Sequence, residues 1–510
     1  MEDNHHEYTQ LEKNRLEKAA RLREQGIEPY PHRVQRSHTS QAAIQAFEAL
    51  ENDEGAEAVQ ATLVGRIRSM RPMGKLVFAH IEDGAGRIQL FIRANDVGKE
   101  QLDLFKSEFD LGDFVEASGE VFRTRTGEIS LRVNEFRILA KAITPLPAAK
   151  DEVTEEGEVV RHASLTDPET RYRQRYADLA INEEVREIFR VRAGVSRALR
   201  DFMDDRGFLE VETPILQPIY GGAAAKPFVT HHNQLKQELY LRISFELYLK
   251  RLLVGGYERV YEIGRDFRNE GVDRTHNPEF TQIEFYWAYA DYNDVMRLTE
   301  EMVRYVAEQV TGGTTIEYQG NQIDLSKDWQ RIELKEGLIE LASIDIDEYP
   351  DAESLAAAMR AKDMKVDPKA PRGKLIDTLI GEFVEPTLIQ PSFLYNYPRD
   401  ISPLAKNLPG DSATVERFEG FMAGFELCNA FTELNDPIEQ ELRFQEMGRA
   451  YTDEDEERHP MDEDYLRAMR YGMPPNGGFG MGVDRLTMLF TDKANIREVI
   501  LFPHLRSRED

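Results

Sequence analysis

The chain of 510 residues carries 64 Lys and Arg against 93 Asp and Glu, which gives a formal charge of −29 at pH 7. At about 150 residues per domain, this length predicts two to four domains. Hydrophobic residues make up 41% and charged residues 31% of the sequence, and this balance excludes a wholly disordered chain. The acidic excess argues against a general polyanion binder, although it leaves room for a local nucleic-acid surface.

Cysteine usage and hydropathy indicate the compartment. Cys428 is the single cysteine, which excludes a disulfide framework within the chain and is typical of a reducing cytosol. No run of about 18 apolar residues predicts a transmembrane helix, and the polar N-terminus lacks the apolar core of a signal peptide. We therefore expect a cytoplasmic protein with no membrane partner.

Residues 1–55 are predicted to form an N-terminal helical extension. Within them, residues 11–25 place apolar side chains at near-helical spacing between charged ones, at Leu11, Leu16, Ala19, Ala20 and Leu22. This pattern predicts an exposed amphipathic helix. The segment GIEPYP ends it, because glycine and proline commonly follow a helix C-terminus.

Residues 56–148 are predicted to form a small all-β domain. About five β-rich runs separated by turn signals are typical of a barrel. In the run RIQLFIR, Ile88, Leu90 and Ile92 are expected to face inward and the residues between them outward. Residues 61–145 contain 13 Lys and Arg and 12 Asp and Glu. The net charge of this segment is therefore close to zero, unlike that of the whole chain, and it would not repel RNA.

A linker and a larger domain follow. Residues 149–178, which continue the Pro- and Ala-rich segment PLPAA (145–149) into a mostly acidic run, are predicted to form a linker. From 179 to 510 amphipathic helices are mixed with β-rich runs, and a helical insertion is expected at about 330–390, where charged residues accompany helical periodicity. The acidic run 452–464 is predicted to be a solvated surface loop.

Common nucleotide and metal motifs are absent from the sequence. It contains no G-x-x-x-x-G-K-[ST] and no G-x-G-x-x-G after a strand, so neither a P-loop nor a dinucleotide fingerprint is supported. There is no H-E-x-x-H, and the histidines and the single cysteine are too sparse for a transition-metal site.

Two strand–loop segments carry stronger signals. In 261–289 a charged loop joins two strands, and Glu284 lies in a run that is otherwise typical of a buried strand. Because an unpaired buried charge is costly, we expect Glu284 to have a cationic partner; a charged surface hairpin is the alternative. In 477–491 a glycine-rich strand, which would allow a ligand or backbone to come close, runs into Asp484 and Arg485. A packed core strand is the alternative, but it leaves Arg485 unexplained.

These segments belong to a longer ordered set. In chain order the set comprises ETPIL in GFLEVETPIL (207–216), GGAAAKPF (221–228), RISFELYLKRL (242–252), FRNEGVDRTHNPEFTQIEFYWAYADY (267–292), FELCNAFTELNDP (425–437) and GMGVDR (480–485). Taken together they resemble the class II aminoacyl-tRNA synthetases, and among them the lysyl-tRNA synthetase family. The likeness covers nearly the whole chain. It departs from the family at Ser244-Phe245, where the family usually has Ala-Pro.

The resemblance implies an α+β fold, with an N-terminal OB-fold barrel that binds the anticodon and a catalytic domain whose central antiparallel sheet is flanked by helices. It also implies a lysine–tRNA ligase reaction in two steps. L-lysine attacks ATP to give lysyl-adenylate, and the 3′ end of tRNA(Lys) then takes the lysyl group. The carboxylate of lysine is itself the nucleophile, so the protein positions the reactants and neutralises charge.

The resemblance assigns the ATP contacts. Arg268 bridges the lysine carboxylate and the α-phosphate, for which its planar fork is suited. Phe280 and Arg485 enclose the adenine, with a cation–π contact from the arginine; core packing is the alternative for Phe280. Arg268 and Arg485 are the expected catalytic residues, and further ATP contacts are implied for Glu270, His276, Asn277 and Gly482.

The pocket for the amino acid is expected to be acidic. The three carboxylates of Glu246, Glu284 and Glu433 match a substrate with two ammonium groups, and such a site rejects uncharged analogues. The resemblance assigns the α-amine of lysine to Glu246 and the Gly222 backbone, the ε-ammonium to Glu433 and Tyr286, and the rest of the pocket to Asn429 and Glu284.

Glu419 and Glu426 are the candidate metal ligands. If Met422 and Ala423 form a tight turn, the two glutamates lie opposite each other on antiparallel strands, where like charges need a cation between them. Carboxylate oxygens shared with ATP phosphates suit Mg²⁺, and the family places ligands at both positions, for up to three ions. A turn headed by Gly424, or two exposed surface glutamates, are the alternatives.

The barrel residues expected to contact the anticodon are Arg71, Phe78, Gln89 and Glu128. OB-folds bind unstacked bases on aromatic side chains and hydrogen-bond to base edges. We therefore expect Phe78 to stack on a base and the polar residues to read base edges.

Two other functions are weighed against the ligase, and a homodimer is implied. A paralogue that lysylates a protein would lack the anticodon barrel. A non-catalytic RNA-binding relative would have broken motifs, whereas Arg268, Glu419, Glu426 and Arg485 are present. In the family the first motif, here the helix before Gly207 and the strand that follows it, supplies the subunit interface.

Overall fold

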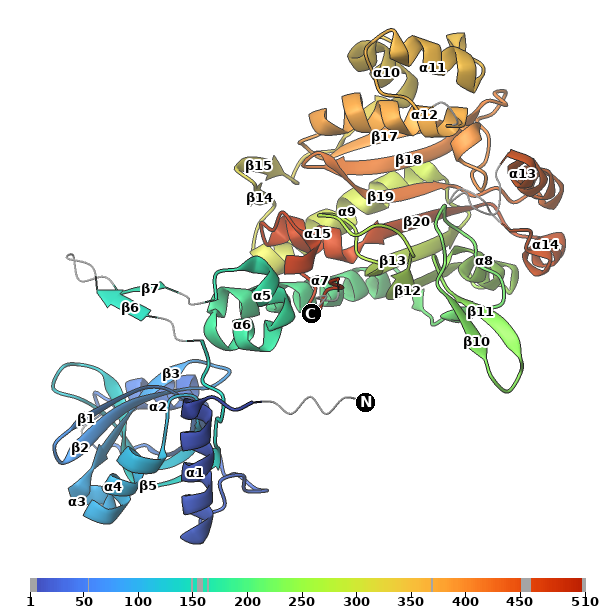
Figure 1. Ribbon diagram of the computed structural model, residues 1–510. Coiled ribbons are helices and arrows are strands. Elements are labelled where there is room, and N and C mark those ends of the chain that lie inside the picture. Colours follow the sequence, from blue (N-terminus) through green and yellow to red (C-terminus); the bar gives the residue numbers. More distant parts are fainter. Residues whose placement is uncertain are drawn as a thin grey trace. The chain divides into compact units, whose positions relative to one another are not determined.

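The computed structural model describes residues 7–53, 55–147, 150–153, 159–162, 165–367, 370–450 and 460–506. It divides the chain into two compact units, residues 1–166 and 167–510, which are coloured along the chain in Figure 1 and are described separately below. Within the described residues no helix is long and apolar enough to cross a membrane. Residues 452–459 of the acidic run lie outside the described residues.

The first unit contains the predicted barrel, which is confirmed. Its strands close in the order β1-β2-β3-β5-β4. Ile88, Leu90 and Ile92 are at most 2% exposed in its core, as their alternation predicts. The bounds are β1 (Gln60–Met73), β2 (Leu76–Glu82), β3 (Arg87–Arg93), β4 (Phe114–Arg123) and β5 (Ile129–Ala140), with α3 (Ala94–Val97) and α4 (Lys99–Glu108) between β3 and β4.

The N-terminal helix α1 (Gln10–Glu24) packs on this barrel by a face different from the predicted one. Ala19 and Leu22 are buried, but Leu11 and Leu16 are 49% and 37% exposed. Buried polar side chains, including Arg15, replace them on the packed face. The predicted apolar stripe is therefore only half correct.

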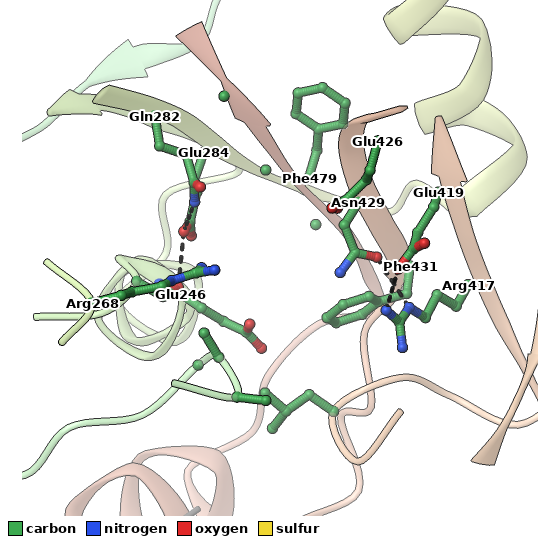
Figure 2. Close-up of a pocket in the computed structure, with 18 of the residues that line it drawn as sticks. Glu246, Arg268, Gln282, Glu284, Arg417, Glu419, Glu426, Asn429, Phe431 and Phe479 are labelled. Carbon is green, nitrogen blue, oxygen red and sulfur yellow. Dashed lines mark hydrogen bonds and ion pairs between the residues drawn. The ribbon is translucent and has the colours of Figure 1, made fainter. Parts of the chain in front are cut away.

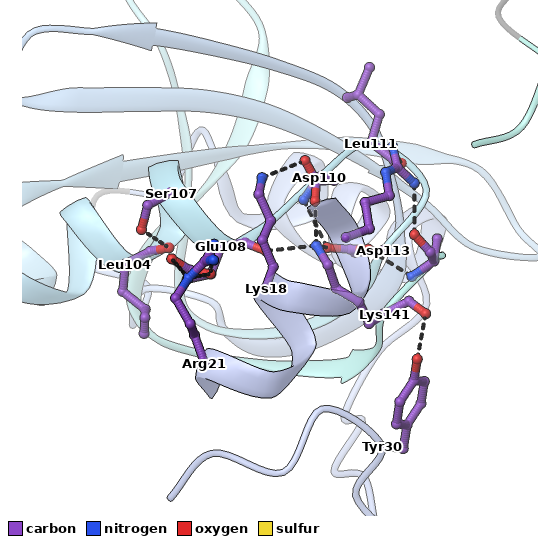
Figure 3. Close-up of polar contacts among 12 residues, drawn as sticks. Lys18, Arg21, Tyr30, Leu104, Ser107, Glu108, Asp110, Leu111, Asp113 and Lys141 are labelled. Carbon is purple, nitrogen blue, oxygen red and sulfur yellow. Dashed lines mark hydrogen bonds and ion pairs between the residues drawn. The ribbon is translucent and has the colours of Figure 1, made fainter. Parts of the chain in front are cut away.

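Polar contacts orient α1, as Figure 3 shows. Arg15 donates to the carbonyls of Ala142 (2.7 Å) and Leu111 (3.1 Å), and Lys18 pairs with Asp110 at 2.8 Å. The same Asp110 also pairs with the buried ammonium of Lys141 at 2.5 Å. Lys141 also pairs with the buried Asp113 at 2.7 Å. Because this lysine is fully buried, losing both carboxylates would leave a costly unpaired charge.

The remaining elements of the first unit are short. Helix α2 (Ser40–Leu50) is capped by the Thr39 side chain, which accepts from the Ala42 N–H at 3.0 Å. Strands β6 (Lys150–Val153) and β7 (Val159–His162) form a two-stranded hairpin.

The second unit begins inside the predicted linker 149–178, with α5 (Pro168–Arg173) and α6 (Arg175–Ile181). Its described residues form an eight-stranded sheet in the order β16-β17-β18-β19-β20-β13-β12-β8. The central pairs are antiparallel, as predicted, and the two edge pairs, β16–β17 and β12–β8, are parallel. The bounds are β8 (Leu209–Glu210), β12 (Arg259–Phe267), β13 (Glu279–Ala288), β16 (Gln330–Glu333), β17 (Ser392–Pro398), β18 (Thr414–Met422), β19 (Phe425–Thr432) and β20 (Asn476–Gly482).

Three helices cover one face of this sheet. The main core joins apolar residues of α7 (Glu183–Asp205), α9 (Tyr292–Thr311) and α15 (Val483–Phe490) to alternate residues of the strands, such as Ile283 and Phe285 of β13. Successive side chains of a strand point to opposite faces. Gln282, Glu284 and Tyr286 therefore point to the other face, where the functional residues gather.

The predicted insertion at about 330–390 contains β16 and a set of helices with a core of their own. Figure 1 shows α10, α11 and α12 beside the β17–β18 end of the sheet. The bounds are α10 (Leu334–Ala342), η1 (Ile346–Glu348), α11 (Ala352–Arg360), α12 (Arg372–Leu379), η2 (Ile380–Val384), η3 (Glu385–Thr387) and η4 (Arg399–Ile401).

The unit contains further helices and two smaller sheets. Helices α8 and α14 pack together around Leu247 and Leu466. The bounds are α8 (Glu246–Val254), α13 (Pro437–Ala450), α14 (Glu463–Arg470), η5 (Ile496–Glu498), the three-stranded sheet of β9 (Leu216–Gln217), β10 (Val229–His232) and β11 (Gln237–Leu241), and the hairpin of β14 (Thr315–Tyr318) and β15 (Asn321–Asp324).

A glycine in the barrel gives a test of its packing. A Cβ at Gly119 would lie 1.9 Å from the carbonyl oxygen of Arg132, whereas a Cβ at Gly84 would meet nothing within 4 Å. Gly119→Ala should therefore destabilise the barrel by about 2 kcal/mol or more, the cost of overpacking, while Gly84→Ala should have little effect. Chemical denaturation followed by circular dichroism measures both. Equal stability of the two variants would contradict the described β4–β5 pairing.

Candidate active site

A cavity of about 410 Å³ opens on the sheet face that carries Glu284, a volume typical of small-molecule sites. Figure 2 shows Glu246 and Arg268 on one side of it, facing Asn429, Glu419 and Arg417 on the other. Every residue that the sequence predicted for lysine, ATP or metal lines this cavity: Gly222, Glu246, Arg268, Glu270, His276, Asn277, Phe280, Glu284, Tyr286, Glu419, Glu426, Asn429, Glu433, Gly482 and Arg485.

The glycine-rich strand β20 makes room for this cavity beside β13. Gly478 pairs with Tyr286 and Gly480 with Glu284. A Cβ at Gly478 would lie 1.8 Å from Oε1 of Glu433. We predicted that a ligand or another backbone comes close to this strand, whereas the group that approaches Gly478 is the Glu433 side chain.

Glu284 is held by neutral donors rather than by the cation that we predicted. Its Oε1 accepts from the Ser244 hydroxyl (2.8 Å), the Phe245 N–H (3.3 Å) and the Gln282 amide (2.6 Å), and its Oε2 accepts from the Tyr286 hydroxyl (3.3 Å). Burial, aided by the nearby carboxylate of Glu246, raises the pKa of Glu284 to about 7. The predicted cationic partner is wrong because a buried carboxylate can be satisfied by hydrogen bonds alone.

A buried lysine that the sequence analysis missed bridges the other two carboxylates. The Lys250 ammonium lies 2.5 Å from Oε1 of Glu246 and forms a second ion pair with Glu433. Its Nζ lies 5.9 Å from the centroid of the Tyr286 ring and 5.5 Å from that of Phe431. The side chain of Lys250 is fully buried.

The charges in this cluster shift one another. Burial raises the pKa of both Glu246 and Glu433, and the Lys250 ammonium opposes the rise in each. Burial alone would lower the pKa of Lys250, but the two carboxylates reverse that direction and raise it above its usual value. Lys250 is therefore a permanent cation, since its raised pKa lies far above neutral pH.

A buried ion network lies beneath Arg268 and gives the segment 207–216 a role. Arg242 donates to Glu262 at 2.6 Å and pairs with Asp266 at 3.4 Å. Glu262 also accepts from the N–H and hydroxyl of Thr213, at 2.9 and 2.7 Å. Burial raises the pKa of Asp266 well above its ordinary value. The network ties the first predicted segment to the strand that leads into Arg268.

Arg485 and His276 meet at the opposite end of the cavity. Arg485 donates to the carbonyl of Glu426 at 2.7 Å and to its carboxylate at 3.2 Å. A second guanidinium nitrogen lies 3.1 Å from Nε2 of His276. The Arg268 guanidinium lies over the Phe280 ring, at 5.1 Å from its centroid.

The turn of the β18–β19 hairpin differs from the predicted one. Ala423 and Gly424 form it, with φ angles of 57° and 79°, between the paired residues Met422 and Phe425. Two positive φ angles are typical of the two-residue hairpin turn that matches the twist of the strands. The turn is therefore neither the predicted one, at Met422 and Ala423, nor the alternative headed by Gly424, because Ala423 occupies its first position.

The pairing of the two candidate metal ligands is therefore also different. A bulge between Gly420 and Phe421 shifts the register, so that Glu419 pairs with Asn429 and Glu426 with Phe421. Glu419 and Glu426 do not oppose each other directly, as the prediction had required. Both nevertheless line the same cavity.

Glu419 sits in a partly neutralised environment. It accepts from Arg417 at 2.5 Å and from the Tyr397 hydroxyl at 2.7 Å. Burial raises the pKa of Glu419 to about 7; Arg417 opposes that rise and Glu426 adds to it. The negative charge of Glu426 therefore disfavours ionisation of Glu419, and a cation bound in this part of the cavity would relieve that repulsion.

These two carboxylates suit a divalent cation that takes its other ligands from elsewhere. No group of three or more His, Cys, Asp or Glu that could hold a metal ion is found in the part of the chain that the structure describes. A Mg²⁺ ion in a protein is commonly bound by only one or two carboxylates, and phosphates and water complete its coordination. The residues present therefore fit Mg²⁺ bound together with a nucleotide.

The structure also adds pocket residues that the sequence analysis missed. Gln282, Arg417 and Phe431 line the cavity with the predicted residues. Strand alternation could have found Arg417 and Gln282, because each lies two residues from a predicted glutamate on the same face. Lys250 lies four residues after Glu246 on α8, a spacing that brings two side chains together on a helix.

A second candidate surface lies on the barrel of the first unit. Phe78 pairs with Phe91 across β2 and β3, with ring centroids 5.3 Å apart, and the Arg71 guanidinium lies 5.6 Å from the Phe78 centroid. Gln89 donates to Glu128 at 2.6 Å. The four residues predicted to contact nucleic acid thus come from the adjacent strands β1, β2 and β3 and from the residue just before β5. Phe91, which the alternation of β3 also predicts on this face, lies beside Phe78. His80, which contacts Glu128 at 2.7 Å, extends the surface beyond the prediction.

Comparisons with known proteins agree with this geometry. The model of the class II tRNA synthetases (D, K and N) matches residues 167–506, and that of the OB-fold nucleic acid binding domain matches residues 61–139. The chain belongs to the class II tRNA synthetases of the D, K and N type. Its first unit contains the OB-fold domain and its second the synthetase domain.

Three relatives of this class II synthetase are similar over nearly their whole length. A lysine–tRNA ligase of Roseiflexus castenholzii is 54% identical, over 99% of this chain and 100% of the relative. Lysine–tRNA ligases of Chloroflexus aurantiacus and Pelotomaculum thermopropionicum are 52% and 49% identical, over 99% and 98% of this chain and 100% and 96% of the relatives.

The one departure from the synthetase pattern has a structural consequence. Ser244 and Phe245 replace the usual Ala-Pro, which has neither a hydroxyl nor a second N–H. Both replacements donate to Glu284. This class II synthetase therefore gives Glu284 two donors that Ala-Pro would lack.

Gly478 offers a test of the crowding around Glu433. Gly478→Ala should displace the Glu433 carboxylate and the Lys250 ammonium paired with it, and should lower amino acid activation by the synthetase more than 100-fold, as expected for a misplaced buried charge. Gly313→Ala, at a position with nothing within 4 Å of a Cβ, is the control. Activation by Gly478→Ala at the control's level would refute the described contact.

Proposed function

We propose that the protein is a lysine–tRNA ligase, which joins L-lysine to tRNA(Lys) with ATP as the energy source. The observation that carries the proposal is the acidic cavity of a class II synthetase, in which Glu246, Glu284 and Glu433 are all buried. Relatives of about 50% identity over the full chain bear the same name.

The choice of lysine follows from charge. Glu246 and the Gly222 backbone would hold the α-ammonium, and Glu433 with Tyr286 the ε-ammonium. A buried acceptor left without its cation is costly, so a neutral amino acid of the same length is rejected. Asn429, which accepts from Arg417 at 3.1 Å, and Glu284 complete the pocket.

The activation step requires positioning rather than a protein nucleophile. Arg268 would bind the lysine carboxylate and the α-phosphate together, and so bring the attacking oxygen close to phosphorus. Phe280 and Arg485 would enclose the adenine, with Glu270, Asn277 and the Gly482 backbone around it. His276 would contact the terminal phosphates. Arg485 would exchange its present contacts with Glu426 and His276 for the nucleotide.

Glu419 and Glu426 would hold Mg²⁺ against the ATP phosphates, with up to three ions in the site. The bound metal would supply positive charge that stabilises the transition state and the leaving pyrophosphate. Arg417 and Tyr397 would orient Glu419 toward the phosphates through the hydrogen bonds already present.

The second unit would act in a homodimer. The segment 207–216 exposes three large apolar side chains: Leu209 is 46% exposed, Ile215 is 44% exposed and Leu216 is 48% exposed. Covering this apolar edge with a second copy would remove it from water. Sedimentation at micromolar concentration should give twice the 58.7 kDa mass of the chain, and a single 58.7 kDa species would contradict the dimer.

The OB-fold barrel would bind the anticodon of tRNA(Lys), and the reaction would take place in the cytoplasm. Phe78 is the proposed stacking residue, with Arg71, Gln89 and Glu128 at base edges. A paralogue that modifies a protein would have no use for this surface. The intact set of Arg268, Glu419, Glu426 and Arg485 disfavours a non-catalytic relative.

The direct test of the proposed function is ATP–pyrophosphate exchange with each of the twenty amino acids. Lysine alone should support exchange, and Mg²⁺ should be required. Exchange should not need tRNA, because every proposed lysine and ATP contact lies in the second unit. Robust exchange with aspartate or asparagine would overturn the choice of substrate.

Phe78→Ala should separate the two half-reactions. Loss of one base stack costs about 1–3 kcal/mol, so kcat/KM for tRNA should fall by about 5- to 150-fold while pyrophosphate exchange is unchanged. Tyr8→Ala, which removes an exposed aromatic residue beside α1 instead, is the control. Undiminished charging of tRNA by a folded Phe78→Ala protein would show that the anticodon face is elsewhere.

A further inference from the structure

Lys250 is a buried cation in the lysine pocket to which the proposed reaction gives no part. Its ammonium contacts Glu246 and Glu433 directly. These are the residues proposed to bind the two ammonium groups of the substrate. Lys250 does not itself line the cavity, so it faces the carboxylates from behind and leaves their other oxygens to the ligand.

The surroundings of Lys250 contain a limited set of titratable groups. Glu246 comes from its own helix α8, and Glu433 follows β19. Glu284 and Tyr286 come from β13 and Tyr465 from α14, while Arg417 of β18 acts on Glu246. Within the described residues, Lys250 is thus the cation that touches two of the three pocket carboxylates.

The formal charges of the pocket side chains match those of a doubly positive ligand. When all three are ionised, Glu246, Glu284 and Glu433 supply three negative charges, and Lys250 supplies one positive charge. Two further positive charges are needed for balance, and lysine brings two ammonium groups while its carboxylate is assigned to Arg268. Buried charges are tolerated when they are paired, so the pocket is balanced by a dication.

We propose that Lys250 is a positioning residue that holds Glu246 and Glu433 ionised, close together and oriented toward the cavity before lysine binds. This inference rests on the proposed function, since it concerns the same pocket. Without Lys250, two neighbouring buried carboxylates would face each other with no cation, and one would take up a proton near neutral pH. A protonated acceptor cannot pair with a substrate ammonium group until that proton leaves.

A purely structural role for Lys250 makes a different prediction. An ion pair that only stabilises α8 would, when lost, lower stability and activity by a factor that does not depend on pH. A charge-holding role predicts a loss that is largest at low pH and disappears as the unpaired carboxylates ionise. The pH dependence therefore separates the two roles.

The experiment compares Lys250→Met with the wild-type protein in pyrophosphate exchange between pH 7 and 9. At pH 7 the variant's KM for lysine should exceed the wild-type KM by at least about tenfold, the equivalent of one pKa unit, with little change in the KM for ATP. The ratio of the two KM values should approach one by pH 9. Taking the ratio removes the titration of the substrate's own α-amine.

Two controls accompany this variant. Lys250→Arg keeps the charge, so its KM ratio should not vary with pH even if the larger side chain lowers activity. Leu253→Ala removes a buried apolar contact on the same helix and should give a loss that is independent of pH. If Lys250→Met does not fold, Lys250→Gln, which keeps a polar head without the charge, should show the same pH trend.

The outcomes are distinguishable. If the wild type shows no exchange with lysine, the proposed function itself fails. If the wild type does, and the KM ratio of the neutral variants is constant with pH as in Leu253→Ala, the inference about Lys250 is overturned. It is also overturned if neither neutral variant folds while Leu253→Ala does, because Lys250 would then be a structural ion pair.

Discussion

The buried carboxylates on one face of the central sheet are the constraint on which the rest of the second unit depends. Glu246, Glu284 and Glu433 are each less than 5% exposed, and isolated buried charges of this kind would be prohibitive. Two of them are compensated by the Lys250 ammonium and the third by four neutral donors. The fold thus provides a cation where two carboxylates meet and hydrogen bonds where one stands apart.

Strand alternation allows the same sheet to carry a core and a site. On β13, Ile283 and Phe285 join the apolar core with α7 and α9, while Glu284 and Tyr286 face the cavity. The glycines of β20 make this possible, because a side chain at Gly478 would occupy the space of Glu433. A polar site of this size is therefore built by the register of β13 and β20 as much as by the identity of its residues.

Much of this could be predicted from the sequence, because local patterns were strong. The alternation of RIQLFIR predicted the inward side chains of β3, and the ordered motifs predicted residues that all line one cavity. What failed depended on tertiary context. The bulge at Gly420 and the turn at Ala423 set the pairing of Glu419, and neither has a strong local signal. The packed face of α1 was decided by Arg15 and its partners, which hydrophobic periodicity does not register. Lys250 was missed because a lysine on a helix is normally taken to be exposed.

We propose that buried negative charge, and not pocket shape, selects the amino acid. Isothermal titration calorimetry with L-lysine and with norleucine, which has the same chain length but no ε-ammonium group, tests it most directly because it requires no turnover. We expect lysine to bind at least about 1,000-fold more tightly than norleucine, since a site built from buried polar groups rejects an analogue that leaves them unpaired. Affinities that differ by no more than about tenfold, the discrimination expected of a site that distinguishes ligands by size alone, would contradict it.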